Sequence, residues 1–143
     1  KTTTKMTTET NQIDCFVVNK NFVPYGIFNT LGGRSIIECK NEERTPRGEY
    51  MSKIHSIITN ANAGGKNDFI KFGIIISKEK GPKTFDKLSH DYYLSNNIII
   101  ISICLDELKE MLDAKNNLLD LIEEKATKVV LNSRKTFQEM GLT

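Results

Sequence analysis

Short apolar runs separated by turn residues are the dominant pattern of this sequence. Runs rich in β-branched and aromatic residues are typical of buried β-strands. The run at 69–77 is apolar on both faces and is therefore expected at the centre of a sheet. The Thr-rich residues 1–11 fit either a frayed tail or a polar edge strand. The predicted strands are 13–18, 35–40, 69–77 and 98–103, with a less regular one at 22–28.

Apolar residues at helical spacing alternate with the later strands. Thr45 and Pro46 predict a helix start, with threonine as the N-cap and proline in the first helical position. We expect that helix to end near Asn60. Thr84 is expected to cap a second helix. Further helices are predicted at 105–112 and 118–131, and residues 132–143 either extend the last one or add a short one.

The order of these elements predicts the fold class. Three strands come first, and then helices alternate with strands, which indicates an α/β fold with a mixed central β-sheet flanked by α-helices. A chain of 143 residues suits one compact domain, so we expect residues 1–143 to form a single domain. The start at Lys1 is also compatible with a fragment of a longer chain.

Composition narrows the class of protein only slightly. The chain is 38% hydrophobic and 27% charged, as in ordinary globular proteins, and its formal charge of +2 neither demands nor excludes nucleic acid. The three cysteines lie far apart in apolar segments, which favours buried free thiols and a reducing, cytoplasmic location. The longest apolar run is too short to span a bilayer, so no membrane partner is expected.

The stretch 36–40, Ile-Ile-Glu-Cys-Lys, carries the candidate chemistry. Side chains alternate across a strand, so Glu38 and Lys40 share a face while Cys39 points the other way. Asp14 lies on an earlier strand, and antiparallel pairing of the two strands would bring it to Glu38. A divalent cation relieves the repulsion of two such carboxylates, and oxygen ligands favour Mg²⁺ or Mn²⁺. A solvent-facing Glu38–Lys40 ion pair is the simpler alternative.

Asp14 followed by Ile-Ile-Glu-Cys-Lys-Asn at 36–41 resembles the PD-(D/E)xK nuclease superfamily, in its restriction-endonuclease-like and Holliday-junction-resolvase-like branches. The helix after this motif, the strand at 73–77 and the Ile-rich strand before Leu105 match the same layout. The resemblance covers roughly residues 12–112. It implies a restriction-endonuclease-like fold and a metal-dependent phosphodiesterase.

The resemblance also implies the role of each motif residue. Asp14 and Glu38 would be metal ligands, and the backbone carbonyl of Cys39 would complete the protein ligands. Lys40 would be the catalytic lysine beside the two acids. The implied cofactor is Mg²⁺, for which Mn²⁺ could substitute.

This sequence departs from the family pattern at two points. Ile13 stands where the name-giving proline would be, and the acid-bearing helix that often precedes the first strand is not visible. Gln12 or Glu9 could contribute instead of that acid. Some branches place a polar residue on the helix after the motif lysine, and Glu49 and Lys53, one helical turn apart, could fill that role.

Basic residues around the motif are candidates for contacts with a phosphate backbone. Three arginines flank the motif strand, and three lysines lie in a Gly-Pro-containing loop that would serve equally well as a plain solvated loop. The candidates for nucleic-acid binding are Arg34, Arg44, Arg47, Lys78, Lys80 and Lys83.

These features predict a Mg²⁺-dependent endonuclease that hydrolyses DNA phosphodiester bonds, as a restriction-type enzyme or its cleavage domain. The alternative is a catalytically inactive module that keeps the nuclease fold and binds DNA. No zinc finger or helix-turn-helix motif is visible, so DNA recognition could lie in a separate domain. Cutting both strands usually requires two active sites, which favours a homodimer.

Overall fold

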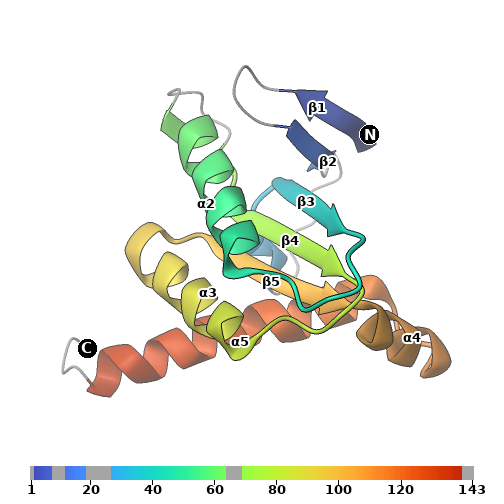
Figure 1. The fold of residues 1–143 in the computed structure, drawn as a ribbon. Helices are drawn as coiled ribbons and strands as arrows, with labels where there is room; N and C mark the ends of the chain where they lie inside the picture. The colour runs from blue at the N-terminus through green and yellow to red at the C-terminus, as the bar shows by residue number, and fades with distance from the viewer. Residues whose placement is uncertain (1, 8–11, 19–26, 64–68, 140–143) are drawn as a thin grey trace.

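The computed structural model describes residues 2–7, 12–18, 27–63 and 69–139. Within them, five strands form one sheet in the order β1-β2-β3-β4-β5, with helices on both faces (Figure 1). The strands are β1 (Thr2–Thr7), β2 (Gln12–Val18), β3 (Arg34–Lys40), β4 (Phe72–Ser77) and β5 (Ile99–Cys104); the helices are α1 (Phe28–Leu31), α2 (Gly48–Ala63), α3 (Lys83–Asn96), α4 (Leu105–Asp113) and α5 (Leu118–Glu139).

The sheet is mixed, as the order of elements predicts. β1, β2 and β3 pair antiparallel, whereas β3, β4 and β5 are parallel. The register of β2 and β3 places Cys15 opposite Ile37, and one step further along it Asp14 faces Glu38. The register of β3 and β4 places Lys40 beside Ser77, so the C-terminal ends of these two parallel strands lie side by side.

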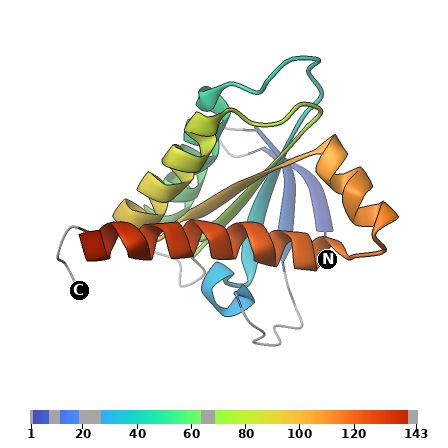
Figure 2. The same ribbon diagram turned by 90° about the horizontal axis from the view of Figure 1, so that it is seen from below.

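Two apolar layers hold the helices on the sheet. Because strand side chains alternate, β4 sends Ile75 to the layer under α2 and α3 and Ile74 to the layer under α5. Helix α5 crosses the second face (Figure 2) and buries Ile122, Ala126 and Val130, which follow one another at intervals of one helical turn. The α2 layer covers the face of β3 that carries Ile36 and Glu38.

Helix α2 lies unusually close to the middle of the sheet. A side-chain carbon added at Gly73 of β4 would lie 2.6 Å from Cγ2 of Ile54 on α2. The absence of a side chain at this position therefore allows the helix to approach the strand. This approach sets the height of α2 above the neighbouring strand β3.

The predicted start of α2 is wrong. The helix begins at Gly48, and Thr45 and Pro46 lie before it in irregular backbone. Pro46 is buried, and the first turn is closed by the amide of Tyr50, which donates to the carbonyl of Arg47. Burial of the proline ring, rather than its preference for the first helical position, decides its place. The helix also continues past the predicted end, to Ala63.

Two other element starts differ from the prediction. Strand β4 begins at Phe72 rather than at Phe69, which is 54% exposed. The side chain of Asn62 holds the approach to this strand, donating to the carbonyl of Ile70 and accepting from its amide. Helix α3 begins at Lys83 after Pro82, so Thr84 is its second residue and not its cap.

The N-terminal and C-terminal predictions are resolved in part. The Thr-rich start of the chain forms the edge strand β1, which was one of its two predicted alternatives. Residues 22–26 of the irregular strand lie outside the described residues, and Phe28 belongs to helix α1 instead. The last helix extends as far as Glu139. Among the described helices, none combines the length and apolar character that crossing a bilayer requires.

Candidate active site

The candidate residues meet where β2 leaves β3. Backbone pairing between the two strands stops at Cys15 and Ile37, and the side chain of Asp14 takes over: its Oδ2 accepts a hydrogen bond of 2.9 Å from the amide of Cys39. The amide and carbonyl of one strand residue point the same way. The Cys39 carbonyl is therefore directed to the Asp14 side of the strand, where a ligand could reach both oxygens.

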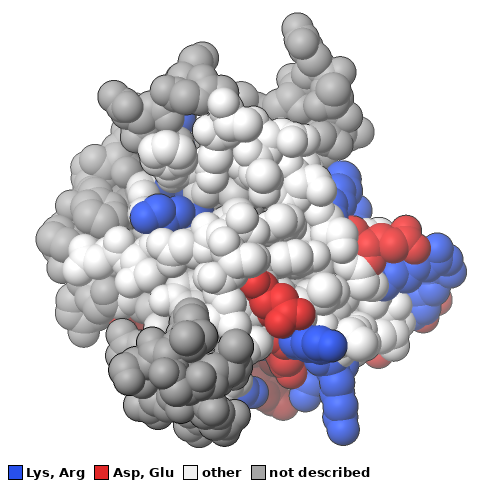
Figure 3. Space-filling model, turned by 90° about the vertical axis from the view of Figure 1, so that its left-hand side faces the viewer, with Lys and Arg blue, Asp and Glu red and all other residues white. Residues whose placement is uncertain are grey.

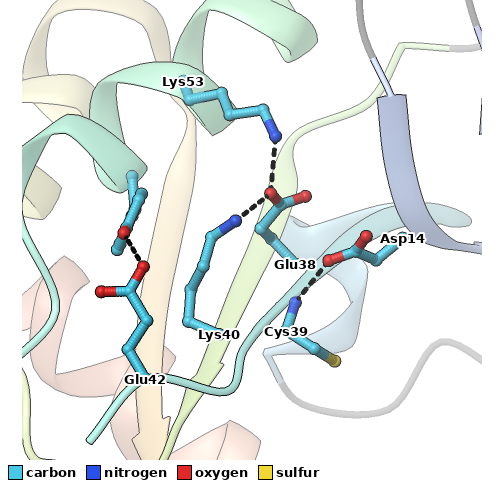
Figure 4. A network of polar contacts seen from close by, with 7 residues as sticks. Asp14, Glu38, Cys39, Lys40, Glu42 and Lys53 are labelled. Atoms are coloured by element: carbon cyan, nitrogen blue, oxygen red, sulfur yellow. Dashed lines mark hydrogen bonds and ion pairs between the residues drawn. The ribbon is translucent and has the colours of Figure 1, made fainter. Parts of the chain in front are cut away.

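Glu38 is a buried carboxylate, with 1% of its side chain exposed. The ammonium groups of Lys40 and Lys53 both lie 2.6 Å from its Oε1 (Figure 4). Lys40 comes from the same strand, two residues on, whereas Lys53 reaches down from α2. The simple solvent-facing ion pair is therefore wrong, because the covering helix removes Glu38 from water and supplies a second cation.

The other carboxylate oxygen of Glu38 is left without a partner. Oε2 is buried and has no hydrogen bond within the described residues, and in Figure 4 it is the oxygen on the Asp14 side. Leaving a buried polar atom unpaired costs about 1–3 kcal/mol, and more for a charged group. An unpaired carboxylate oxygen beside a second carboxylate is the donor set that Mg²⁺ and Mn²⁺ take. The residues present thus fit a hard divalent cation.

The protein ligands available for such a cation are few. No group of three or more His, Cys, Asp and Glu side chains that could hold a metal occurs in the described part of the chain. The candidate donors are therefore Asp14, Glu38 and the backbone carbonyl of Cys39. The remaining positions of a six-coordinate ion would be left to water and substrate, as is usual for Mg²⁺.

The Cys39 thiol does not belong to this donor set. It is exposed and lies on the face of β3 opposite to Glu38, while Cys15 is half-buried and Cys104 is buried. Partial burial raises the pKa of the Cys39 thiol, and the nearby charge of Asp14 raises it further. A thiol that keeps its proton is a poor metal ligand. The prediction of free thiols is confirmed, but burial holds only for Cys104.

Lys40 is held by two neighbours, the Glu38 carboxylate and the Tyr50 ring. Burial by itself would lower the pKa of Lys40, but the hydrogen bond and charge of Glu38 outweigh it and raise that pKa overall. Its ammonium also lies 4.7 Å from the ring centre of Tyr50, a cation–π distance. The Tyr50 hydroxyl donates to Glu42, which in turn accepts from Arg44 at 2.9 Å.

Tyr50 and Glu42 were not recognised in the sequence as parts of this site. Tyr50 lies three residues before Lys53 on α2, so the two side chains share one helix face. That spacing is the signal that could have found Tyr50, but its aromatic character favoured a core position. Glu42 carries no comparable signal, because its contact with Tyr50 depends on the path of the loop after β3.

The accessory residues predicted from the sequence differ in whether they reach Glu38. Lys53 reaches Glu38, whereas Glu49 is 75% exposed and pairs with Arg47 at 3.8 Å. The backbone of Gln12 begins β2, but its side chain lies outside the described residues, as does all of Glu9. The helix after the motif therefore contributes a cation to Glu38 and not an additional acid.

The six predicted nucleic-acid contacts fall into three groups. Arg34 is the first residue of β3, about 13 Å along the strand from Glu38, so it is not brought to the site. Arg44 and Arg47 lie in the loop after β3 and pair with neighbouring glutamates. The loop after β4 emerges at the same end of the strands, where Lys78 lies 3.4 Å from Glu43 and Lys80 is exposed. Lys83, also exposed, is the first residue of α3.

A cavity of about 450 Å³ lies elsewhere, between α3, α4 and α5. It is lined by side chains that include Asp86, Glu107, Glu124 and Lys125, and by none of the predicted catalytic residues. Lys125 and Glu107 form an ion pair of 2.6 Å at its wall. The candidate active site is thus a polar cluster near the C-terminal end of β3 and not this cavity.

Comparisons of the chain with protein-family models, with curated proteins and with solved structures found no match. The class that the fold defines is therefore an α/β protein with a mixed sheet flanked by helices. Within that class, the particular feature of this chain is a buried acid, Glu38, that is bound by two lysines and faces a second acid.

Proposed function

We propose that this protein is a Mg²⁺-dependent endonuclease of the restriction-endonuclease-like fold, acting on DNA. One observation carries the proposal: Glu38 is buried with Oε2 unpartnered on the Asp14 side, while two lysines hold its Oε1. A carboxylate that served only as half of an ion pair would not need that vacant buried oxygen. The mixed sheet with its motif at the end of β3 supports the same fold.

Each residue has a distinct part in the proposed reaction. Asp14, Glu38 and the Cys39 carbonyl would hold the metal ion. Such an ion would lower the pKa of a water molecule and would stabilise negative charge on the attacked phosphate. Lys40, fixed by Glu38 and the Tyr50 ring, donates hydrogen bonds that orient the attacking water and a phosphate oxygen.

The basic residues at the sheet edge support DNA as the substrate. The loops after β3 and β4 bring Arg44, Lys78 and Lys80 to the strand ends near Lys40, where Arg44 pairs with Glu42 and Lys78 with Glu43. The opposite edge, at the left of Figure 1, presents a wide area that is neither basic nor acidic among the described residues (Figure 3). The candidate phosphate contacts and the candidate metal ligands thus lie on one side.

Plasmid nicking in Mg²⁺ tests the proposal. We expect the wild-type chain to nick supercoiled DNA, and Asp14→Asn, Glu38→Gln and Lys40→Met each to lower the rate by at least about 100-fold. Glu124→Gln, an exposed acid on α5 across the sheet, is the matched control and should cut normally. Equal cutting by all variants would remove these residues from the mechanism.

Two observations favour a second candidate, an inactive DNA-binding module with the same fold. Lys40 and Lys53 already neutralise Glu38, and no set of three metal-ligating side chains occurs in the described residues. This candidate predicts DNA binding with steep salt dependence and no nicking in either Mg²⁺ or Mn²⁺. Nicking that depends on a divalent cation and on Glu38 would exclude it.

A further inference from the structure

The charges around Glu38 cancel without a metal ion. Asp14 and Glu38 contribute two negative charges, and Lys40 and Lys53 contribute two positive ones, so the four side chains sum to zero. One divalent cation would bring the cluster to +2. A phosphodiester and a hydroxide ion, each carrying one negative charge, would return it to zero. The cluster is thus matched to a single ion with its substrate.

Lys53 is the residue that creates this balance. Its ammonium lies 2.6 Å from Glu38 Oε1, on the oxygen that is not aimed at Asp14. It is also the more open of the two cations, since 37% of its side chain is exposed against 19% for Lys40. Lys40 is fixed further by the Tyr50 ring, so Lys53 is the lysine better able to reach a ligand in solvent.

We propose that the Lys53 ammonium takes the place of a second metal ion, so that each site holds one divalent cation and binds a DNA phosphate through Lys53. This inference rests on the proposed function. A second ion would have to share Glu38 Oε1 with two ammonium groups. It would also lack further side-chain ligands, since the described residues contain no group of three or more Asp, Glu, Cys or His side chains that could hold a metal ion. The ammonium supplies positive charge without needing such ligands.

Metal binding provides a test that does not depend on catalysis. We would titrate Mn²⁺ into the full chain and measure stoichiometry and affinity by calorimetry, for wild type, Lys53→Met and Lys53→Arg. The expected result is one ion per wild-type chain. Lys53→Met should bind that ion at least about threefold more tightly, because an adjacent cation no longer opposes it. Lys53→Arg should bind like wild type.

DNA binding provides the second readout. In Ca²⁺, which takes the same kind of oxygen ligands, the affinity for a duplex oligonucleotide would be measured over a salt series. Losing one phosphate contact should lower the slope of log affinity against log salt by about 0.9 in Lys53→Met. Lys53→Arg should keep the wild-type slope. So should the control Lys128→Met, an exposed lysine on α5.

The outcomes separate this inference from the proposed function. Two Mn²⁺ ions per wild-type chain, or a Lys53→Met chain with wild-type metal affinity and an unchanged salt slope, would overturn the role of Lys53 and leave a nuclease intact. A wild-type chain that binds no Mn²⁺ would instead overturn the proposed metal site, and the inference with it. Thermal unfolding of each variant would show that the fold is kept.

Discussion

Asp14 Oδ2 accepts a hydrogen bond of 2.9 Å from the Cys39 amide, 25 residues later in the chain. The contact continues the β2–β3 pairing one position past the last backbone pair, with a side chain in place of a carbonyl. Asp14 therefore has two separable roles. Its side chain accepts a hydrogen bond that extends the β2–β3 pairing, and its negative charge faces Glu38.

Substitutions at Asp14 should separate these roles. Asp14→Asn keeps a side-chain oxygen for the Cys39 amide, so its free energy of unfolding should stay within about 0.5 kcal/mol of wild type, as for a mild surface change. Asp14→Ala leaves the amide unpaired and should lose about 1 kcal/mol. Both should lose Mn²⁺ affinity. Urea unfolding and calorimetry measure the two effects, and an Asn variant that binds Mn²⁺ normally would contradict the metal role.

Glu38→Gln should destabilise the chain even without metal. The substitution removes the only carboxylate that the structure shows bound by Lys40 and Lys53, and two ammonium groups then face a neutral amide. Because both lysines are partly exposed, we expect a loss of about 1–3 kcal/mol, below that for a fully buried charge pair. Combining Glu38→Gln with Lys53→Met should recover part of the loss. A double variant as unstable as the sum of the singles would argue against this coupling.

Gly73→Ala tests the close approach of α2 to β4. The new methyl group would meet Cγ2 of Ile54 at 2.6 Å, so either the helix or the strand must move, at a cost of about 1–3 kcal/mol. Ile54→Ala removes the obstructing atom, and in that background Gly73→Ala should be much less harmful. Gly48→Ala is the control, since its new methyl group would meet Cδ1 of Leu88 at an ordinary 3.8 Å. Chemical denaturation of the four variants measures this coupling.

The Glu107 carboxylate should make the free energy of unfolding depend on pH in the acid range. Burial would raise the pKa of Glu107, but the hydrogen bond from Lys125, with help from the Cys104 amide, lowers it overall. A pKa lowered in the folded state stabilises the fold above the ordinary glutamate value of about 4.3. That stability is lost as the pH falls from there towards the folded pKa.

Unfolding measured between about pH 5.5 and pH 3 should reveal this dependence. Wild type should lose more stability over that range than Glu107→Gln, which has no proton to take up at this position. Glu110→Gln, an exposed acid on the same helix, should follow wild type. Parallel curves for wild type and Glu107→Gln would refute a stabilising role for this carboxylate.

The parts of the fold that depend on local pattern were predictable from the sequence. The runs at 13–18 and 98–103 match β2 and β5 to within one residue at each end. Short apolar stretches of β-branched residues strongly favour buried β-strands. The start of α2 was not predictable from its capping residues. There, burial of Pro46 overrides the local preference of the Thr-Pro pair, and burial is a property of the whole fold.

The candidate site divides in the same way. The alternation that puts Glu38 and Lys40 on one face, and the meeting of Asp14 with Glu38, follow from strand geometry and an antiparallel register. The Tyr50–Glu42 contact depends on how the loop after β3 turns, and no spacing rule gives that path. Arg34 begins β3 and lies four residues before Glu38 on that strand, and its predicted phosphate contact stays a prediction.

Because β3 and β4 end side by side, the loops that follow them could change in sequence while the site stays fixed. The loops 41–47 and 78–82 leave the sheet there, while Glu38 is fixed by strand register and by Lys53 on a helix. Insertions or charge changes in either loop could therefore alter which ligands are bound without moving Glu38. Engineering a new preference would begin in these loops, with the strand ends kept as a constant frame.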